Sequence, residues 1–111
     1  MMTQTHYIFG RDIKDAGVLD NIFHNISSDI MSLEVYGNFS GIISVEAKLD
    51  KNNEEFIPIV GIDMSELSLA KTINKNGIYQ YSIEGINDIR INVKDISGNA
   101  NITAKMINSA E

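Results

Sequence analysis

The chain has 111 residues, a formal net charge of −6, and neither cysteine nor tryptophan. This length fits one domain. The lack of cysteine excludes disulfide scaffolds, thiolate zinc sites and cysteine nucleophiles. Nucleic-acid binding needs a basic face, because phosphate neutralisation supplies much of the affinity. Since the nine basic residues are scattered, no nucleic-acid partner is expected.

Membrane and secretion signals are absent from the sequence as given. No segment reaches the roughly 18 apolar residues that a membrane span requires. The stretch 1–7 has no basic start and no apolar signal core. We therefore expect synthesis in the cytoplasm of the host cell and no membrane partner. Isoleucine and asparagine are used heavily and proline once, a bias typical of AT-rich genes and of a low-GC Gram-positive host.

The first segment, residues 1–14, is predicted to be an N-terminal arm preceding a domain at 15–111. Tyr7, Ile8 and Phe9 make this arm apolar, and a free tail has no reason to be apolar. The arm should dock either on its own domain or on a neighbouring molecule. We take these three residues as the candidate interface.

The next segment, residues 18–26, supports two readings. Val18, Leu19, Ile22, Phe23 and Ile26 have helical spacing. Valine, isoleucine and phenylalanine also favour strands. A strand near 18–24 is preferred, and a short helix remains open.

Strict alternation of apolar and polar residues follows in three runs, which is the pattern of strands with one buried and one solvated face. The apolar sets are Ile43, Val45, Ala47 and Leu49; then Ile89, Ile91 and Val93; and finally Ala100, Ile102, Ala104 and Met106.

Turn signals separate the predicted strands, which fall near 31–36, 42–50, 55–61, 69–74, 78–84, 88–95 and 100–107. The segments 37–41 and 97–99 are predicted to be turns, and Asn76–Gly77 is typical of a type I′ hairpin. Residues 62–68 break the alternation and indicate a crossover loop, with room for one helical turn. Pro58 predicts an edge strand or a bulge. Short strands with frequent turns predict an all-β, antiparallel β-sandwich of jelly-roll or Ig-like type with about seven to eight strands.

No pattern indicates catalysis, a cofactor or a metal. His6 and His24 lack partners at metal-ligand spacing, and no serine lies in a nucleophile elbow. Asp63, Glu66 and Asp95 could supply calcium with oxygen ligands, but no EF-hand spacing supports this. Tyr79 and Tyr81 share one strand face with Ile83, which favours core packing over a carbohydrate platform. We therefore expect no enzyme activity.

Several segments together resemble a known family. They are 32–37, 41–47, 76–79, 85–91 and 96–104, with Leu19-Asp20-Asn21 as an opening strand motif. They are similar to small β-sandwich domains of tailed-bacteriophage and prophage virion proteins, of head decoration, fibre-base or baseplate type. The resemblance covers roughly residues 17–107. It departs from the family at Phe56, where a tryptophan is common, and in the short 37–41 loop.

The resemblance implies a non-catalytic virion protein that acts as a homo-oligomer beside other virion proteins, such as the major capsid or tail proteins. Capsid decoration is the favoured role, and the protein is expected in the virion. A tail or baseplate component and a carbohydrate-binding module are the alternatives. The motif contains no functional residue that could be carried over to this sequence.

Overall fold

The computed structural model describes residues 3–19, 23, 24, 26 and 28–108, and every element in them is a strand. The strands form one antiparallel sheet in the order β1-β8-β3-β7-β5-β6, with β2 paired to β8 and β4 to β3. The elements are β1 (Thr3–Ile13), β2 (Gly17–Val18), β3 (Ile30–Lys48), β4 (Ile57–Pro58), β5 (Gly61–Asp63), β6 (Ser68–Ala70), β7 (Gly77–Ser82) and β8 (Asp88–Asn108). The predicted all-β, sandwich-like class is confirmed.

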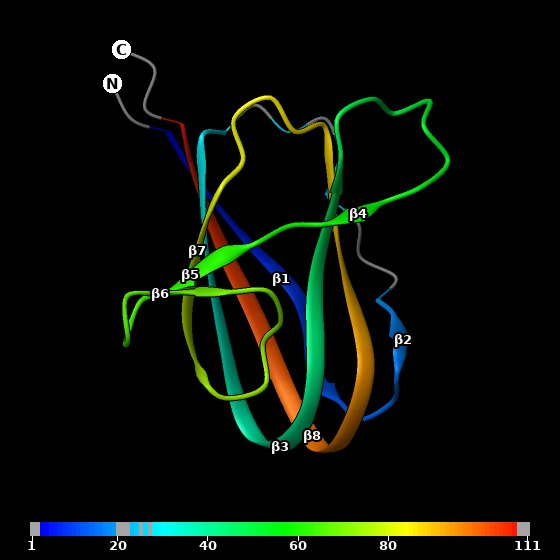
Figure 1. The fold of residues 1–111 in the computed structure, drawn as a ribbon, viewed down its shortest axis with the longest axis vertical. Helices are drawn as coiled ribbons and strands as arrows, with labels where there is room; N and C mark the ends of the chain where they lie inside the picture. Colours follow the sequence, from blue (N-terminus) through cyan, green and yellow to red (C-terminus); the bar gives the residue numbers. More distant parts are fainter. Residues whose placement is uncertain (1–2, 20–22, 25, 27, 109–111) are drawn as a thin grey trace.

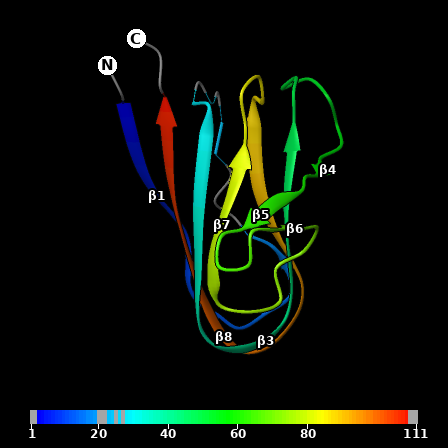
Figure 2. The same ribbon diagram turned by 60° about the vertical axis from the view of Figure 1, so that its left-hand side comes forward.

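Two long strands, β3 and β8, build both layers of the sandwich. They are paired from Ile30 opposite Ile107 to Lys48 opposite Asp88. Both run to the lower end of the molecule and turn back upward (Figures 1 and 2). One layer contains the first half of β3 and the second half of β8, flanked by β1 and β7. The other contains the remaining halves, flanked by β2 and β4.

The core lies between these layers and is filled by the apolar sets that alternation predicts. Those of the three runs are at most 4% exposed, with Leu49 as the exception at 69%. Side chains from β3, β7 and β1 complete the core, including Leu33, Tyr79 and Phe9. Burial of this kind contributes roughly 25 cal/mol per Å² of apolar surface and is the main stabilising term.

The predicted turns at 37–41 and 97–99 are wrong, because both segments lie within continuous strands. Ile42 pairs with Asp95 and Ile43 pairs with Val93, so Lys94 is an additional residue on β8. Such a bulge shifts the side-chain alternation by one position. In β8, the odd-numbered residues point inward before the bulge and the even-numbered residues point inward after it.

Glycines permit the sharp bend of the two long strands. A Cβ atom at Gly41 would collide with the carbonyl oxygen of Asp95, and one at Gly98 with that of Asn38. Gly98 also has a φ of 89°, a conformation that residues with a Cβ adopt at a cost. The sequence signals read as turns therefore mark the point where two paired strands fold over together.

The segment predicted to be an arm is a strand of the sheet. β1 pairs with β8 from Thr3 opposite Asn108 onward, with register shifts between Ile8 and Ile13. Asp12 has a positive φ of 54° in this irregular part. Backbone hydrogen bonding to β8 and a buried Phe9 hold the segment on its own domain.

The segment after β1 continues along the same edge of β8, on the other half of that strand. Leu19 donates a backbone hydrogen bond to Ile91, and Phe23 forms an isolated bridge with Ile89. The strand predicted near 18–24 is therefore observed only at β2 and at this bridge. Asp20 and Asn21 of the proposed opening motif, and Ile22, lie outside the described residues.

The chain between β3 and β7 contains short strands. Pro58 lies in β4, an edge strand, where its missing N–H needs no partner. The predicted crossover loop at 62–68 is instead a hairpin of β5 and β6. The predicted type I′ turn at Asn76–Gly77 is wrong, because neither residue has a positive φ and Gly77 already begins β7.

Candidate functional site

A charged pair with a buried carboxylate lies where β3 and β8 face each other. Arg90 Nε donates to Glu46 Oε1 at 2.7 Å, and Asn92 Nδ2 donates to Glu46 Oε2 at 3.2 Å. Glu46 is only 5% exposed, although alternation places it on the wet face. The phenyl ring of Phe56 lies 4.2 Å from Arg90 Cζ and helps to cover this face. Each carboxylate oxygen of Glu46 thus has a donor within the protein.

A second charged group continues along the same strands. The carboxylate of Asp88 is 3.7 Å from Lys48 Nζ and 3.3 Å from His24 Nδ1. Lys48 Nζ also donates to the carbonyl oxygens of Lys51 and Asn53, at 3.4 and 3.0 Å. These bonds tie the loop after β3 to the strand. The charged groups of this cluster bind one another and the loop carbonyls, so the cluster is suited to holding the loop after β3 in place.

The β5–β6 turn has its own polar cluster, built on Asp63. Ser65 donates from both its hydroxyl (2.7 Å) and its backbone N–H (3.0 Å) to Asp63 Oδ1. These bonds, with the hydroxyl contribution the larger, lower the pKa of Asp63, against the opposing effect of burial. Lys75 Nζ is 3.7 Å from Asp63 and 2.6 Å from Glu66, and its pKa is raised by Glu66.

The sequence analysis considered Asp63 and Glu66 as calcium ligands, and the position of Lys75 argues against such a site. The ammonium group of Lys75 lies between Asp63 and Glu66, where a cation would have to bind. Among the residues that the structure describes, no group of three or more acidic or histidine side chains is placed to hold a metal ion. The cluster therefore fastens the β5–β6 turn to the segment before β7.

The tyrosines considered as a carbohydrate platform lie in different places. Tyr79 and Tyr81 are 2% and 3% exposed, whereas Tyr36 is 46% exposed. The Tyr79 hydroxyl donates to the carbonyl oxygen of Lys75 at 2.8 Å. Burial raises the pKa of both Tyr79 and Tyr81. The structure thus places the Tyr79–Tyr81 pair in the core, as the sequence favoured.

Two of the three candidate interface residues belong to the domain's own core. Phe9 is 1% exposed, and Tyr7 packs against the core. The Tyr7 ring makes edge contacts with Phe9 and Phe23 at centroid distances of 5.0 and 4.8 Å. Ile8 points to the opposite side of β1 and is half-buried. The apolar character of this segment is therefore explained mainly by its role as a strand.

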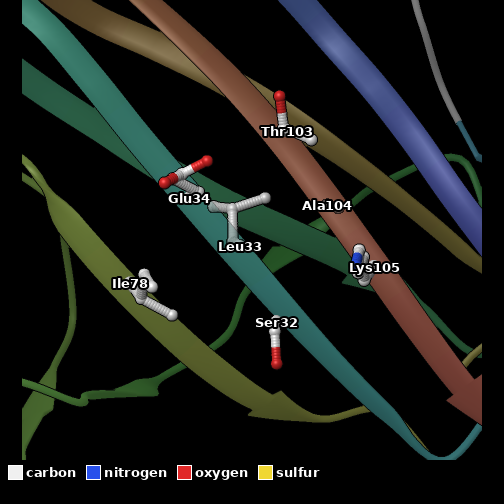
Figure 3. A pocket seen from close by; sticks show the side chains of 7 residues that line it. All are labelled: Ser32, Leu33, Glu34, Ile78, Thr103, Ala104 and Lys105. Carbon is white, nitrogen blue, oxygen red and sulfur yellow. The ribbon is translucent and has the colours of Figure 1, made fainter.

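A shallow groove crosses the outer face of β7, β3 and β8 (Figure 3). Its volume is about 210 Å³. The residues that line it are Ser32, Leu33, Glu34, Ile78, Thr103, Ala104 and Lys105. Side-chain alternation predicts the outward direction of all of these except Leu33 and Ala104. Without the pairing register, however, the sequence does not show that they lie side by side.

Comparison with known proteins gives likeness in structure and none in sequence. No family model matches the chain, and no curated protein matches it. The solved structure of the SPBc2 prophage-derived protein YomS is similar, with a TM-score of 0.87 and 16% identity, over 96% of this chain and 95% of that one. The fold is shared with a prophage-derived protein. At this identity the likeness establishes the fold alone.

Two further structures share the architecture. The PBSX exported protein XepA matches with a TM-score of 0.84 and 14% identity over 96% of this chain, which corresponds to 38% of XepA. A protein of the disulfide-linked pili called Bacillus endospore appendages matches with a TM-score of 0.50 and 10% identity, over 96% of this chain and 85% of that one. Since this sequence has no cysteine, disulfide linkage has no counterpart here.

Within the described residues, no helix is long and apolar enough to cross a bilayer.

Proposed function

We propose that this chain is a non-catalytic structural protein of a bacteriophage particle and that it decorates the capsid surface. The observation that carries the proposal is the fold, shared over nearly the full length of both chains with a protein described as prophage-derived. The family resemblance of the sequence leads in the same direction. Major capsid or tail proteins would be its neighbours, and further copies of itself its first partners.

The polar clusters support a structural role. The carboxylates of Glu46, Asp63 and Asp88 are each engaged by cationic side chains of the same chain. Such groups fasten loops and strands and are not free to act on a substrate. The burial of Tyr79 and Tyr81 supports a scaffold over a glycan-binding module, because stacking on a sugar needs exposed rings.

The test is mass spectrometry on purified particles of the phage that encodes the chain, after heads and tails have been separated. High copy number in the head fraction is the expected result. Presence in tails alone would replace decoration with a tail or baseplate role. XepA is described as exported, so culture fluid cleared of particles is the third fraction to measure. Finding the protein there and in no particle would reject the virion proposal.

A further inference from the structure

The outward side chains of the larger layer form an ordered pattern, which we call the outer face. Register places one row across six strands: Leu69, Ile62, Gln80, Ser32, Lys105 and His6. The adjacent row contains Ile78, Glu34, Thr103 and Ile8. Apolar groups therefore gather at the β5–β6 side, and charged groups lie near the middle.

The apolar part of the outer face is unusually exposed for isoleucine and leucine. Ile62, Ile78 and Leu69 are 41%, 48% and 79% exposed. Their positions in adjacent strands make them neighbours, because cross-strand and diagonal side chains lie within contact distance. Adjoining exposed apolar groups rimmed by polar ones are typical of protein–protein contact sites.

The charged part of the outer face carries one group of each sign. Glu34 lies on β3 and Lys105 on β8, diagonally across the strand pair. Within the described part of the chain, neither side chain takes part in an ion pair. In Figure 3 the Glu34 carboxylate extends away from Lys105. Both charges are thus available to a molecule that approaches this face.

We propose that the outer face binds a second copy of this chain, with Glu34 of one copy opposite Lys105 of the other. A surface that carries both signs beside an apolar patch is matched by a surface with the same composition. A second copy supplies the acid, the base and the apolar patch together. The inference rests on the proposed structural role, in which copies assemble on a particle, and it names the surface through which they meet.

Charge reversal tests the pairing directly. Glu34→Lys places a lysine opposite Lys105 of the other copy, and Lys105→Glu places two acids together. Like charges at an interface are costly. Each single variant should therefore weaken self-association at least about tenfold, and the double variant should restore much of it. Ile78→Ser should also weaken association, since it removes apolar contact area. Sedimentation equilibrium over a concentration series gives the association constants.

Matched controls separate the outer face from general charge effects. Glu84→Lys and Lys94→Glu change the net charge by the same amounts at exposed positions outside the outer face. They should leave association unchanged. Circular dichroism melts check that each variant folds. A wild-type chain that stays monomeric at every concentration would overturn the inference, as would single reversals that act no more strongly than these controls.

The failure of this inference is distinguishable from failure of the proposed function. A chain found in particles but monomeric in solution would retain the virion role and reject the self-contact. A chain absent from particles but associating through Glu34 and Lys105 would do the opposite.

Discussion

Glu46 and Arg90 are directly opposite each other on β3 and β8, and the side chain of Glu46 is 7% exposed while that of Arg90 is 26% exposed. Their hydrogen bond links β3 and β8, the two strands that build both layers. The pair therefore joins the central strands at the end of the molecule away from the bend.

Replacing Arg90 should leave the buried carboxylate of Glu46 without its cationic partner and with Asn92 as its remaining donor. Arg90→Met is expected to lower the free energy of unfolding by about 2–3 kcal/mol, less than for a fully buried pair because Arg90 retains contact with water. The double variant Glu46→Leu with Arg90→Met should cost less than the sum of the single changes. Urea unfolding of the four proteins completes the cycle. Additive effects would show that the two residues are not coupled.

The bend at Gly98 gives a second prediction, because Gly85 provides a matched control. The two glycines have φ values of 89° and 86°, but only Gly98 has backbone where a Cβ would go. Gly85→Ala should cost about 1–2 kcal/mol for the left-handed backbone alone. Gly98→Ala should cost clearly more, since Asn38 must also move. Equal losses of stability would mean that the close approach at the bend does not matter.

The two faces of β1 give a third prediction. Phe9→Ala should lower the free energy of unfolding by about 3–5 kcal/mol, because it opens a cavity in the core. Ile8→Ala, on the outward side, should cost under about 1 kcal/mol. Thermal unfolding of both variants measures the contrast. Similar, small effects would return this segment to the role of a loosely held arm.

The turn at Asp63 gives a prediction about pH. Its pKa is lowered in the folded protein, so the unfolded chain binds more protons in acid. The stabilisation is therefore present above the ordinary pKa of 3.8 and is lost as the pH falls below it. Asp63→Asn should reduce the fall in melting temperature between neutral pH and about pH 3. Asp95→Asn, at an exposed position, is the control for the loss of one carboxylate, and Asp63→Asn should change the acid response more than this control does.

The fold class and most of the core were predictable from the sequence because both depend on side-chain period. Ile43, Val45 and Ile91 are buried as alternation requires. The course of the long strands was not predictable in this way. The change from odd to even positions between Val93 and Ala100 is produced equally by a turn and by a bulge, and only pairing with β3 distinguishes them.

The polar clusters and the outer face were harder to predict from the sequence. Glu46 is buried where Arg90 and Asn92, both distant from it in the sequence, donate to its carboxylate and Phe56 covers Arg90. The outer face likewise depends on register, since Glu34 and Lys105 become neighbours only when β3 and β8 are aligned. The apolar segment at Tyr7–Phe9 was recognised, and two of its residues, Tyr7 and Phe9, pack in or against the domain's own core.

The central position of β8 has a consequence for how the molecule forms. It follows all the other described strands in the sequence, yet β1 and β3 are both hydrogen-bonded to it, so during synthesis these earlier strands must wait for it. Pairings between distant parts of a chain close slowly, and such all-β domains commonly fold in about milliseconds to seconds. Until β8 has left the ribosome, β1 and β3 have no native neighbour in common, and the sheet cannot be completed.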